Sequence, residues 1–158
     1  MSSGATFMTV AAAGVCSAVL GFWLSRFTRR IGTPALAPCR RGPAQMSLLV
    51  RKDLQMGKGK QATQCAHATL GAYRRAVRRF PADLMAWEGF GQAKVALQIQ
   101  DEAELMEMKS RSEQAGLCTY VVYDAGRTQI APDTATVLAI GPAPKSFLQT
   151  LTGHLKLL

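Results

Sequence analysis

The sequence predicts a mixed α/β domain, in which helices cover a β-sheet, preceded by a single transmembrane helix. The domain is predicted because strand-like and helical patterns alternate after residue 46, and such alternation is typical of a sheet covered by helices. The transmembrane helix is predicted by a long apolar run near the beginning of the sequence. With 158 residues, the chain has room for one ordinary domain and some additional sequence.

The first 30 residues are predicted to be a membrane anchor with a basic flank. No charged residue occurs in 2–25, and 7–24 is mostly Ala, Val, Phe, Leu and Gly, which as a helix would span a bilayer. Arg26, Arg29 and Arg30 follow, so the positive-inside rule places the rest of the chain in the cytosol. The membrane would be the mitochondrial outer membrane or the endoplasmic reticulum. Import into mitochondria with cleavage is the alternative, because the segment is rich in arginine and lacks acids.

Residues 31–46 contain three prolines without an apolar period and are predicted to be a linker. The predicted domain therefore covers 47–158. The predicted elements along the chain are strand Ser47–Asp53, helix Gln61–Arg79, short helix Pro81–Phe90, strand Lys94–Gln100, helix Asp101–Ala115, strand Leu117–Tyr123, strand Thr134–Ile140 and helix Pro144–Leu151. Gly141-Pro142 is expected to end the last strand. The long helix between the first two strands favours parallel pairing of those strands.

The charge distribution restricts where a nucleic acid could bind. The formal net charge is +9, but residues 1–52 hold seven basic residues and no acidic one. The remaining residues hold 12 basic and 10 acidic groups, so only local clusters there can favour binding to RNA. The four cysteines are scattered without CxxC spacing, which argues against a disulfide framework or a zinc site.

The segment Met56–His67, MGKGKQATQCAH, joins the first strand to the long helix and is the first candidate site. Glycines, lysines and a helix start together suit an anion. The spacing does not match the phosphate loop of nucleotide triphosphatases. On a helix, Lys60, Gln64 and His67 lie at i, i+4 and i+7 and share one face. A single histidine in a helix is, however, more often packed or solvated than catalytic.

The second candidate is Asp124–Ile130, DAGRTQI, which follows a strand. A polar loop at the carboxyl end of a strand is a frequent position for an active site. Asp124 could orient a water molecule, and Arg127 could hold a phosphate. From the residues alone, an ordinary turn is the simpler interpretation, since Asp, Gly and Thr suit turns.

Several stretches in series resemble the type II peptidyl-tRNA hydrolase family: VRKDLQMGKGKQATQCAHA, GQAKV, DAGRTQIAPDTATVLAIGP and TGHLKLL. The resemblance covers about residues 47–158. It implies a four-stranded mixed sheet with helices on both faces, often in a homodimer, and no metal or other cofactor. It also implies hydrolysis of the ester bond in peptidyl-tRNA, releasing tRNA and peptide after premature dissociation from the ribosome.

The resemblance implies catalytic roles for Lys60, Asp124 and Thr128. We expect Lys60 to stabilise developing negative charge, and Asp124 with Thr128 to activate water. The residues expected to bind tRNA are Lys58, Gln64, His67, Arg127 and Thr136. Two alternatives stay open: a membrane-anchored adaptor that retains the hydrolase fold, and an RNA-binding domain without hydrolytic activity.

Overall fold

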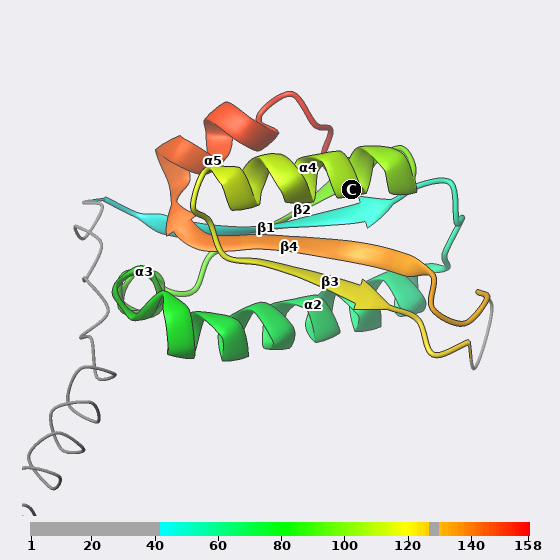
Figure 1. Ribbon diagram of the computed structural model, residues 1–158, viewed down its shortest axis with the longest axis horizontal. Helices are drawn as coiled ribbons and strands as arrows, with labels where there is room; N and C mark the ends of the chain where they lie inside the picture. The colour runs from blue at the N-terminus through cyan, green and yellow to red at the C-terminus, as the bar shows by residue number, and fades with distance from the viewer. Residues whose placement is uncertain (1–41, 127–129) are drawn as a thin grey trace, which may run out of the picture. The chain divides into compact units, whose positions relative to one another are not determined.

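The computed structural model describes residues 42–126 and 130–158, which form a four-stranded mixed sheet with helices on both faces (Figure 1). This confirms the predicted fold of the domain. The elements are β1 (Ala44–Arg51), α2 (Lys58–Arg79), α3 (Pro81–Gly89), β2 (Lys94–Ile99), α4 (Glu102–Gln114), β3 (Thr119–Tyr123), β4 (Ala135–Pro144) and α5 (Lys145–Thr152).

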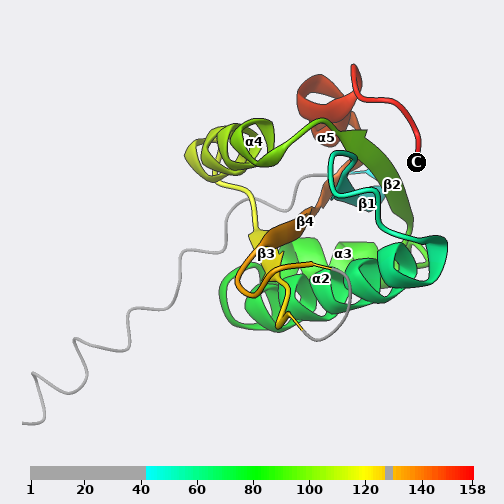
Figure 2. The same cartoon turned by 90° about the vertical axis from the view of Figure 1, so that its right-hand side faces the viewer.

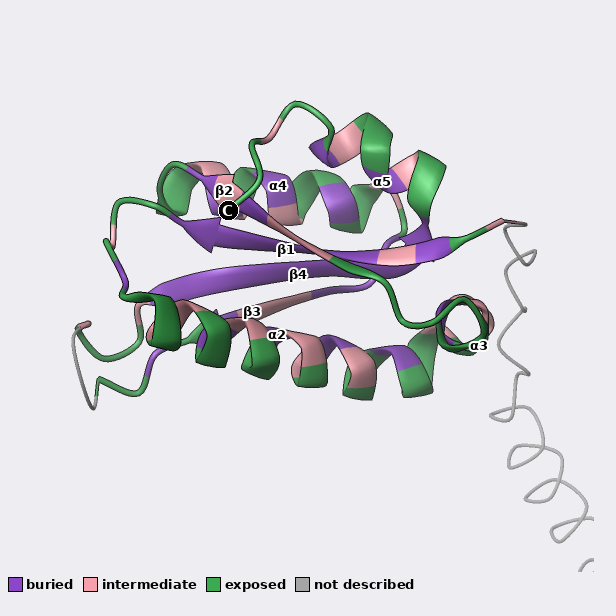
Figure 3. Cartoon of the chain, turned by 180° about the vertical axis from the view of Figure 1, so that it is seen from behind, coloured by how far each residue is buried: buried purple, intermediate pink, exposed green. Residues whose placement is uncertain are grey.

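The strands lie in the order β2-β1-β4-β3. β1 and β2 are parallel, as the helical crossover between them predicted, whereas β4 is antiparallel to both β1 and β3. In Figure 1, α4 and α5 lie above the sheet and α2 and α3 lie below it. The two central strands are therefore covered on both faces, which explains why they are buried along almost their whole length (Figure 3).

The core on the α2 side depends on a stripe of small residues. Ala68, Ala72 and Ala76 recur every four residues and have no exposed surface, so α2 lies with one narrow face against the sheet. They pack with alternate residues of β1, such as Met46 and Leu48. The opposite face of the sheet packs against α4 and α5 in a second apolar cluster.

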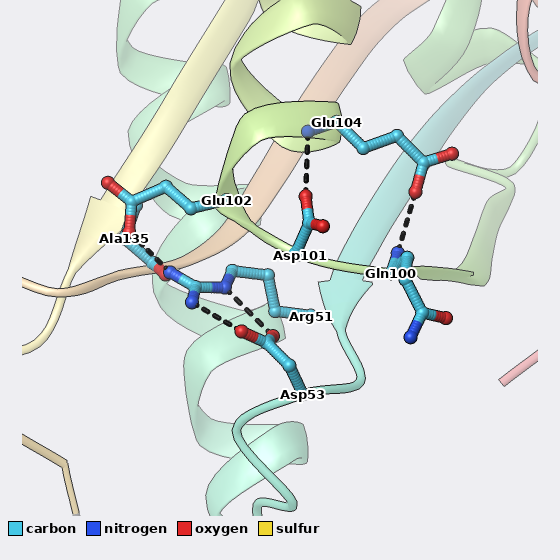
Figure 4. A network of polar contacts seen from close by, with 7 residues as sticks. All are labelled: Arg51, Asp53, Gln100, Asp101, Glu102, Glu104 and Ala135. Carbon is cyan, nitrogen blue, oxygen red and sulfur yellow. Dashed lines mark hydrogen bonds and ion pairs between the residues drawn. The ribbon is translucent and has the colours of Figure 1, made fainter.

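The start of α4 is capped by side chains on both sides of its first turn. The Asp101 side chain accepts a hydrogen bond from the Glu104 backbone N–H at 2.9 Å, and the Glu104 side chain accepts one from the Gln100 N–H at 2.7 Å (Figure 4). Both groups satisfy backbone donors near the helix start that would otherwise lack partners.

The largest differences from the predicted strand boundaries are at the start of β1 and the end of β4. β1 begins at Ala44 rather than Ser47, because Ala44 is buried and pairs with Pro144. β4 continues through Gly141 and Pro142 to Pro144 instead of ending before them. Gly141 has a φ of +105° and lies beside a register shift between β1 and β4, so the glycine lets the strand bend and continue.

The predicted anchor over 1–30 and most of the predicted linker lie outside the described residues. Within 42–126 and 130–158, none of the helices is long and apolar enough to cross a membrane.

Candidate active site

The direction of the strands brings the two candidate segments together. β1, β2 and β3 all run in the same direction, and β4 runs in the opposite direction. The carboxyl ends of β1, β2 and β3 therefore meet at one edge of the sheet. β4 starts at that same edge. The turn after β1, which leads into α2, therefore lies near the segment that follows β3.

Lys60, in the first turn of α2, and Asp124, directly after β3, form an ion pair at this edge. Lys60 Nζ lies 2.9 Å from Asp124 Oδ2, and the side chains are only 11% and 7% exposed. The other carboxylate oxygen accepts a hydrogen bond from the Gly126 N–H at 2.7 Å. The hydrogen bond from Lys60, followed by that from Gly126, lowers the pKa of Asp124 below its ordinary value. The aspartate is thus ionised at neutral pH and can hold a water molecule.

Gln64 and Thr136 hold the carboxylate in place from behind. Gln64 Nε2 donates to Asp124 Oδ2 at 2.9 Å, and Thr136 Oγ1 lies 2.9 Å from Gln64 Oε1. A carboxylate can only accept hydrogen bonds, so the amide nitrogen of Gln64 must face Asp124 and its oxygen must face the hydroxyl. Thr136 has no exposed surface and Gln64 is 8% exposed. Their side chains therefore position Asp124; in this conformation Thr136 offers no surface to tRNA.

A groove of about 970 Å³ runs from the ion pair along α2 and β3. Lys60, Gln64 and His67 all line it, which confirms the prediction that they share one helix face. His67 is exposed, so its imidazole faces the groove rather than the core. Lys58 is also exposed, at the first residue of α2, but does not line the groove.

Two predicted site residues, Arg127 and Thr128, lie outside the described residues, and their roles stay predictions. Within the two described ranges, no group of three His, Cys, Asp or Glu side chains could hold a metal ion. The expectation of a reaction without metal is not tested by this.

One polar network at the same edge was not predicted from the sequence (Figure 4). The buried Arg51 guanidinium, at the end of β1, binds Asp53 with bonds of 2.6 and 3.0 Å and Glu102 at 2.6 Å. It also donates to the Ala135 carbonyl oxygen at 2.8 Å. The guanidinium thereby fixes the start of β4 one residue before Thr136. The sequence did contain a signal for this network: Arg51 ends an apolar strand, and an acidic residue, Asp53, follows two positions later.

Comparison with known proteins finds one family whose sequence profile matches residues 44–158, described as Peptidyl-tRNA hydrolase PTH2. The chain is 53% identical over 114 residues to "Probable peptidyl-tRNA hydrolase 2" of Drosophila melanogaster, covering 72% of this chain and 61% of that protein. It is 48% identical over 116 residues to the human "Peptidyl-tRNA hydrolase 2, mitochondrial", covering 73% and 65%. It is 43% identical over 110 residues to "Peptidyl-tRNA hydrolase" of Thermococcus onnurineus, covering 70% and 93%. The matched region thus spans less than two thirds of the fly and human relatives.

Proposed function

The chain belongs to the Peptidyl-tRNA hydrolase PTH2 family, and from that premise we propose that it hydrolyses the ester bond of peptidyl-tRNA. The products would be free tRNA and a peptide with a free carboxylate. The observation that carries the proposal is the ion pair of Lys60 and Asp124, mostly buried at the end of an open groove. Such a pair offers a cation for developing negative charge and an oriented acceptor for water, the two groups that ester hydrolysis needs.

In the proposed reaction, a water molecule held by Asp124 attacks the carbonyl carbon of the ester. The ammonium group of Lys60 stabilises the negative charge that develops on the carbonyl oxygen. The carbon–oxygen bond to the terminal ribose then breaks, and the ribose oxygen takes up the proton that the attacking water gives up, so that it leaves as a hydroxyl group. Since the pKa of Asp124 is lowered chiefly by Lys60, its carboxylate is a weak base, and we assign it the role of orienting water rather than fully deprotonating it. Thr128 is proposed to complete the water site.

The proposed positioning residues are Gln64 and Thr136, which hold Asp124 through a buried chain of hydrogen bonds. This role replaces the direct tRNA contact expected for them from the sequence. Fixed geometry matters here because positioning of water and ester supplies a large part of such a rate acceleration.

The tRNA is proposed to contact the exposed start of α2, where Lys58 carries a positive charge and the first turn contains no acidic residue. The free N–H groups of a helix start add to the attraction for phosphate. His67 and Arg127 remain proposed tRNA contacts. Binding should weaken as salt rises, because each phosphate contact releases counterions.

The test is single-turnover cleavage of peptidyl-tRNA by the full-length protein. Lys60→Ala and Asp124→Ala are each expected to reduce the rate by roughly a hundredfold or more, the scale of losing one charge-stabilising group. Lys58→Ala should weaken tRNA binding and reduce its salt dependence while leaving the single-turnover rate at saturation unchanged. Full activity in both Lys60→Ala and Asp124→Ala would refute the assignment. A folded wild-type protein without activity would instead favour the adaptor.

For localisation we propose an association with mitochondria, supported by the word mitochondrial in the names of the cattle, human and mouse relatives. The finer proposal is an anchor over residues 1–30 that leaves the domain facing the cytosol. Imaging of the full-length protein and of a variant lacking 1–30 tests it, since membrane association should disappear only in the variant. The proposed homodimer is tested by the mass in solution.

A further inference from the structure

The two border strands of the sheet differ in what lies beside them. The chain's last residues run along the outer edge of β2, where Leu157 forms a bridge with Leu97 and the Gln98 N–H donates to the Lys156 carbonyl oxygen at 2.8 Å. β3 forms the other border, above α2 in Figure 2. In the part of the chain that the structure describes, no strand pairs with its outer edge. An open edge of this kind can accept another extended chain.

The outer edge of β3 faces the groove of the candidate site. Six consecutive residues, 120–125, line that groove. Side chains of a strand point alternately to opposite faces of the sheet, so an unbroken run of lining residues means that the main chain itself forms the wall. On the other side of the groove lies the face of α2 that carries Lys60 and His67.

The register identifies which main-chain groups point into the groove. The Gly141 N–H donates to the Cys118 carbonyl oxygen at 2.8 Å, so these opposite residues form a hydrogen-bonded pair. Pairs alternate along an antiparallel ladder, and Val121, opposite Leu138, therefore directs its N–H and C=O away from β4. Thr119 faces outward too, but its carbonyl oxygen accepts a hydrogen bond from Arg75 at 2.6 Å. Within 42–126 and 130–158, no hydrogen bond is made to the outward main-chain groups of Val121, so the half of the edge next to Asp124 can accept a ligand.

We propose that the peptide part of peptidyl-tRNA binds this edge of β3 as an added strand, an inference that rests on the proposed function. The ester must reach Lys60 and Asp124 at the carboxyl end of β3, so the peptide runs parallel to β3. At about 3.3 Å per residue, the stretch from Val121 to Asp124 accommodates three or four peptide residues. Pairing through the main chain reads no side chains, which suits a hydrolase acting on peptides of any sequence.

The single-stranded end of the tRNA is the other occupant to consider, because Arg74, His67 and Tyr120 also line the groove. Stacking of bases on aromatic rings is the usual basis for such binding. The ring of Tyr120 is already packed against α2: a Cβ added at Gly71 would lie 2.2 Å from its Cε1 atom. One face of that ring is therefore occupied, and the outward main-chain groups of β3 favour the peptide.

The first test uses the full-length protein and peptidyl-tRNAs that carry an acetylated tetra-alanine peptide, N-methylated at one amide at a time. Methylation removes one N–H donor, and loss of one hydrogen bond should reduce kcat/KM about fivefold to tenfold. We expect this loss at alternate positions only, because successive N–H groups of a strand point to opposite sides; the methyl derivatives between them are the matched controls.

The outcomes separate the two proposals. Failure to cleave the unmodified substrate would refute the proposed function, whereas cleavage with equal rates across the methylated series would refute only the added strand. A flat methylated series combined with a large loss on removing the bases of the terminal cytidines would assign the groove to RNA and overturn the proposal.

A second test changes the protein. Val121→Pro removes the outward N–H without removing a hydrogen bond to β4, and proline is tolerated on such edges. It should raise KM about fivefold for the tetrapeptide substrate and leave KM unchanged for an acetylated single amino acid, which does not reach Val121. Val121→Ala loses similar packing but keeps the N–H, so it should not change the ratio of the two KM values. Equal ratios in both variants would contradict the added strand.

Discussion

Replacing Thr136 by valine tests whether the buried hydrogen bonds behind Asp124 serve the reaction. The valine keeps the shape of the side chain and removes the hydroxyl that lies 2.9 Å from Gln64 Oε1 and 3.2 Å from the Val122 carbonyl oxygen. Gln64 is only 8% exposed, so water cannot readily replace the lost donor. A buried acceptor left without a partner costs about 1–3 kcal/mol.

We expect two effects of Thr136→Val. The free energy of unfolding, measured in urea, should fall by about 1–3 kcal/mol. The Gln64 amide, no longer fixed by the hydroxyl, should rotate and lose its bond to Asp124. If most of the same cost appears in the transition state, the single-turnover rate falls roughly fivefold to a hundredfold. The affinity for tRNA should not change, because Thr136 has no exposed surface.

Thr136→Ser is the matched control, since it keeps the hydroxyl and removes only a methyl group. Its rate should stay close to that of the wild type, although its stability should fall by about 1 kcal/mol. A serine variant as slow as the valine variant would show that the hydroxyl is not what matters. Weaker tRNA binding with an unchanged cleavage rate in Thr136→Val would refute the positioning role and restore the tRNA contact.

Three further predictions concern charge, thiols and packing. Lys60→Met should raise the pKa of Asp124, which Lys60 holds below its ordinary value of about 3.9. In the wild type, Asp124 stays ionised and active as pH falls, until the lowered pKa is reached. In the variant the carboxylate would be protonated at a higher pH, so the acid limb in the pH dependence of the residual activity should shift upward. Burial raises the pKa of the Cys65 thiol and raises that of the more deeply buried Cys118 to about 11, so iodoacetamide at pH 8 should modify Cys65 before Cys118, as resolved by mass spectrometry of the peptides. Gly71→Ala should lower the free energy of unfolding by about 1–3 kcal/mol through overpacking, despite alanine's helix preference of about 1 kcal/mol, as urea unfolding would show.

Each of these has an internal control. Lys52→Met removes an exposed cation just after β1 and should leave the acid limb in place. In unfolded protein, iodoacetamide should modify Cys65 and Cys118 at the same rate. A difference in rate that persists after unfolding would mean that burial is not its cause. Gly89→Ala adds a Cβ with nothing within 4 Å, so a loss of stability equal to that of Gly71→Ala would contradict the packing argument.

The sequence was sufficient for the layers of the fold and for placing Lys60 and Asp124 in one candidate site, although it did not predict their ion pair. Strand and helix patterns determined the elements, and the resemblance to a family linked two segments that are 64 residues apart. The buried face of α2 was harder to predict. Its small and polar residues differ little in hydropathy, so the periodicity did not separate the buried Gln64 from the exposed residues beside it. In the structure, Gln64 continues the buried stripe of Ala68, Ala72 and Ala76 into the site.

Gln64 and Thr136 were named as site residues but with another role, because a sequence motif does not show burial. A polar residue at the end of a buried alanine stripe was the signal that would have indicated a positioning role. The end of β4 was missed for a different reason. Gly-Pro usually stops a strand, and only the pairing of the neighbouring β1 residues shows that the strand continues.

The turn between α3 and β2 lies at the edge of the sheet opposite the candidate site, because β2 starts there. The turn includes Gly91 and Gln92, both with positive φ, and the Trp87 indole N–H is bonded to the Ala93 carbonyl oxygen at 2.8 Å. The turn is thus stabilised by a hydrogen bond within this side of the domain and takes no part in the proposed chemistry. A fluorescent label or an affinity handle inserted next to the exposed Phe90 would report on the protein during turnover while leaving groove and ion pair untouched.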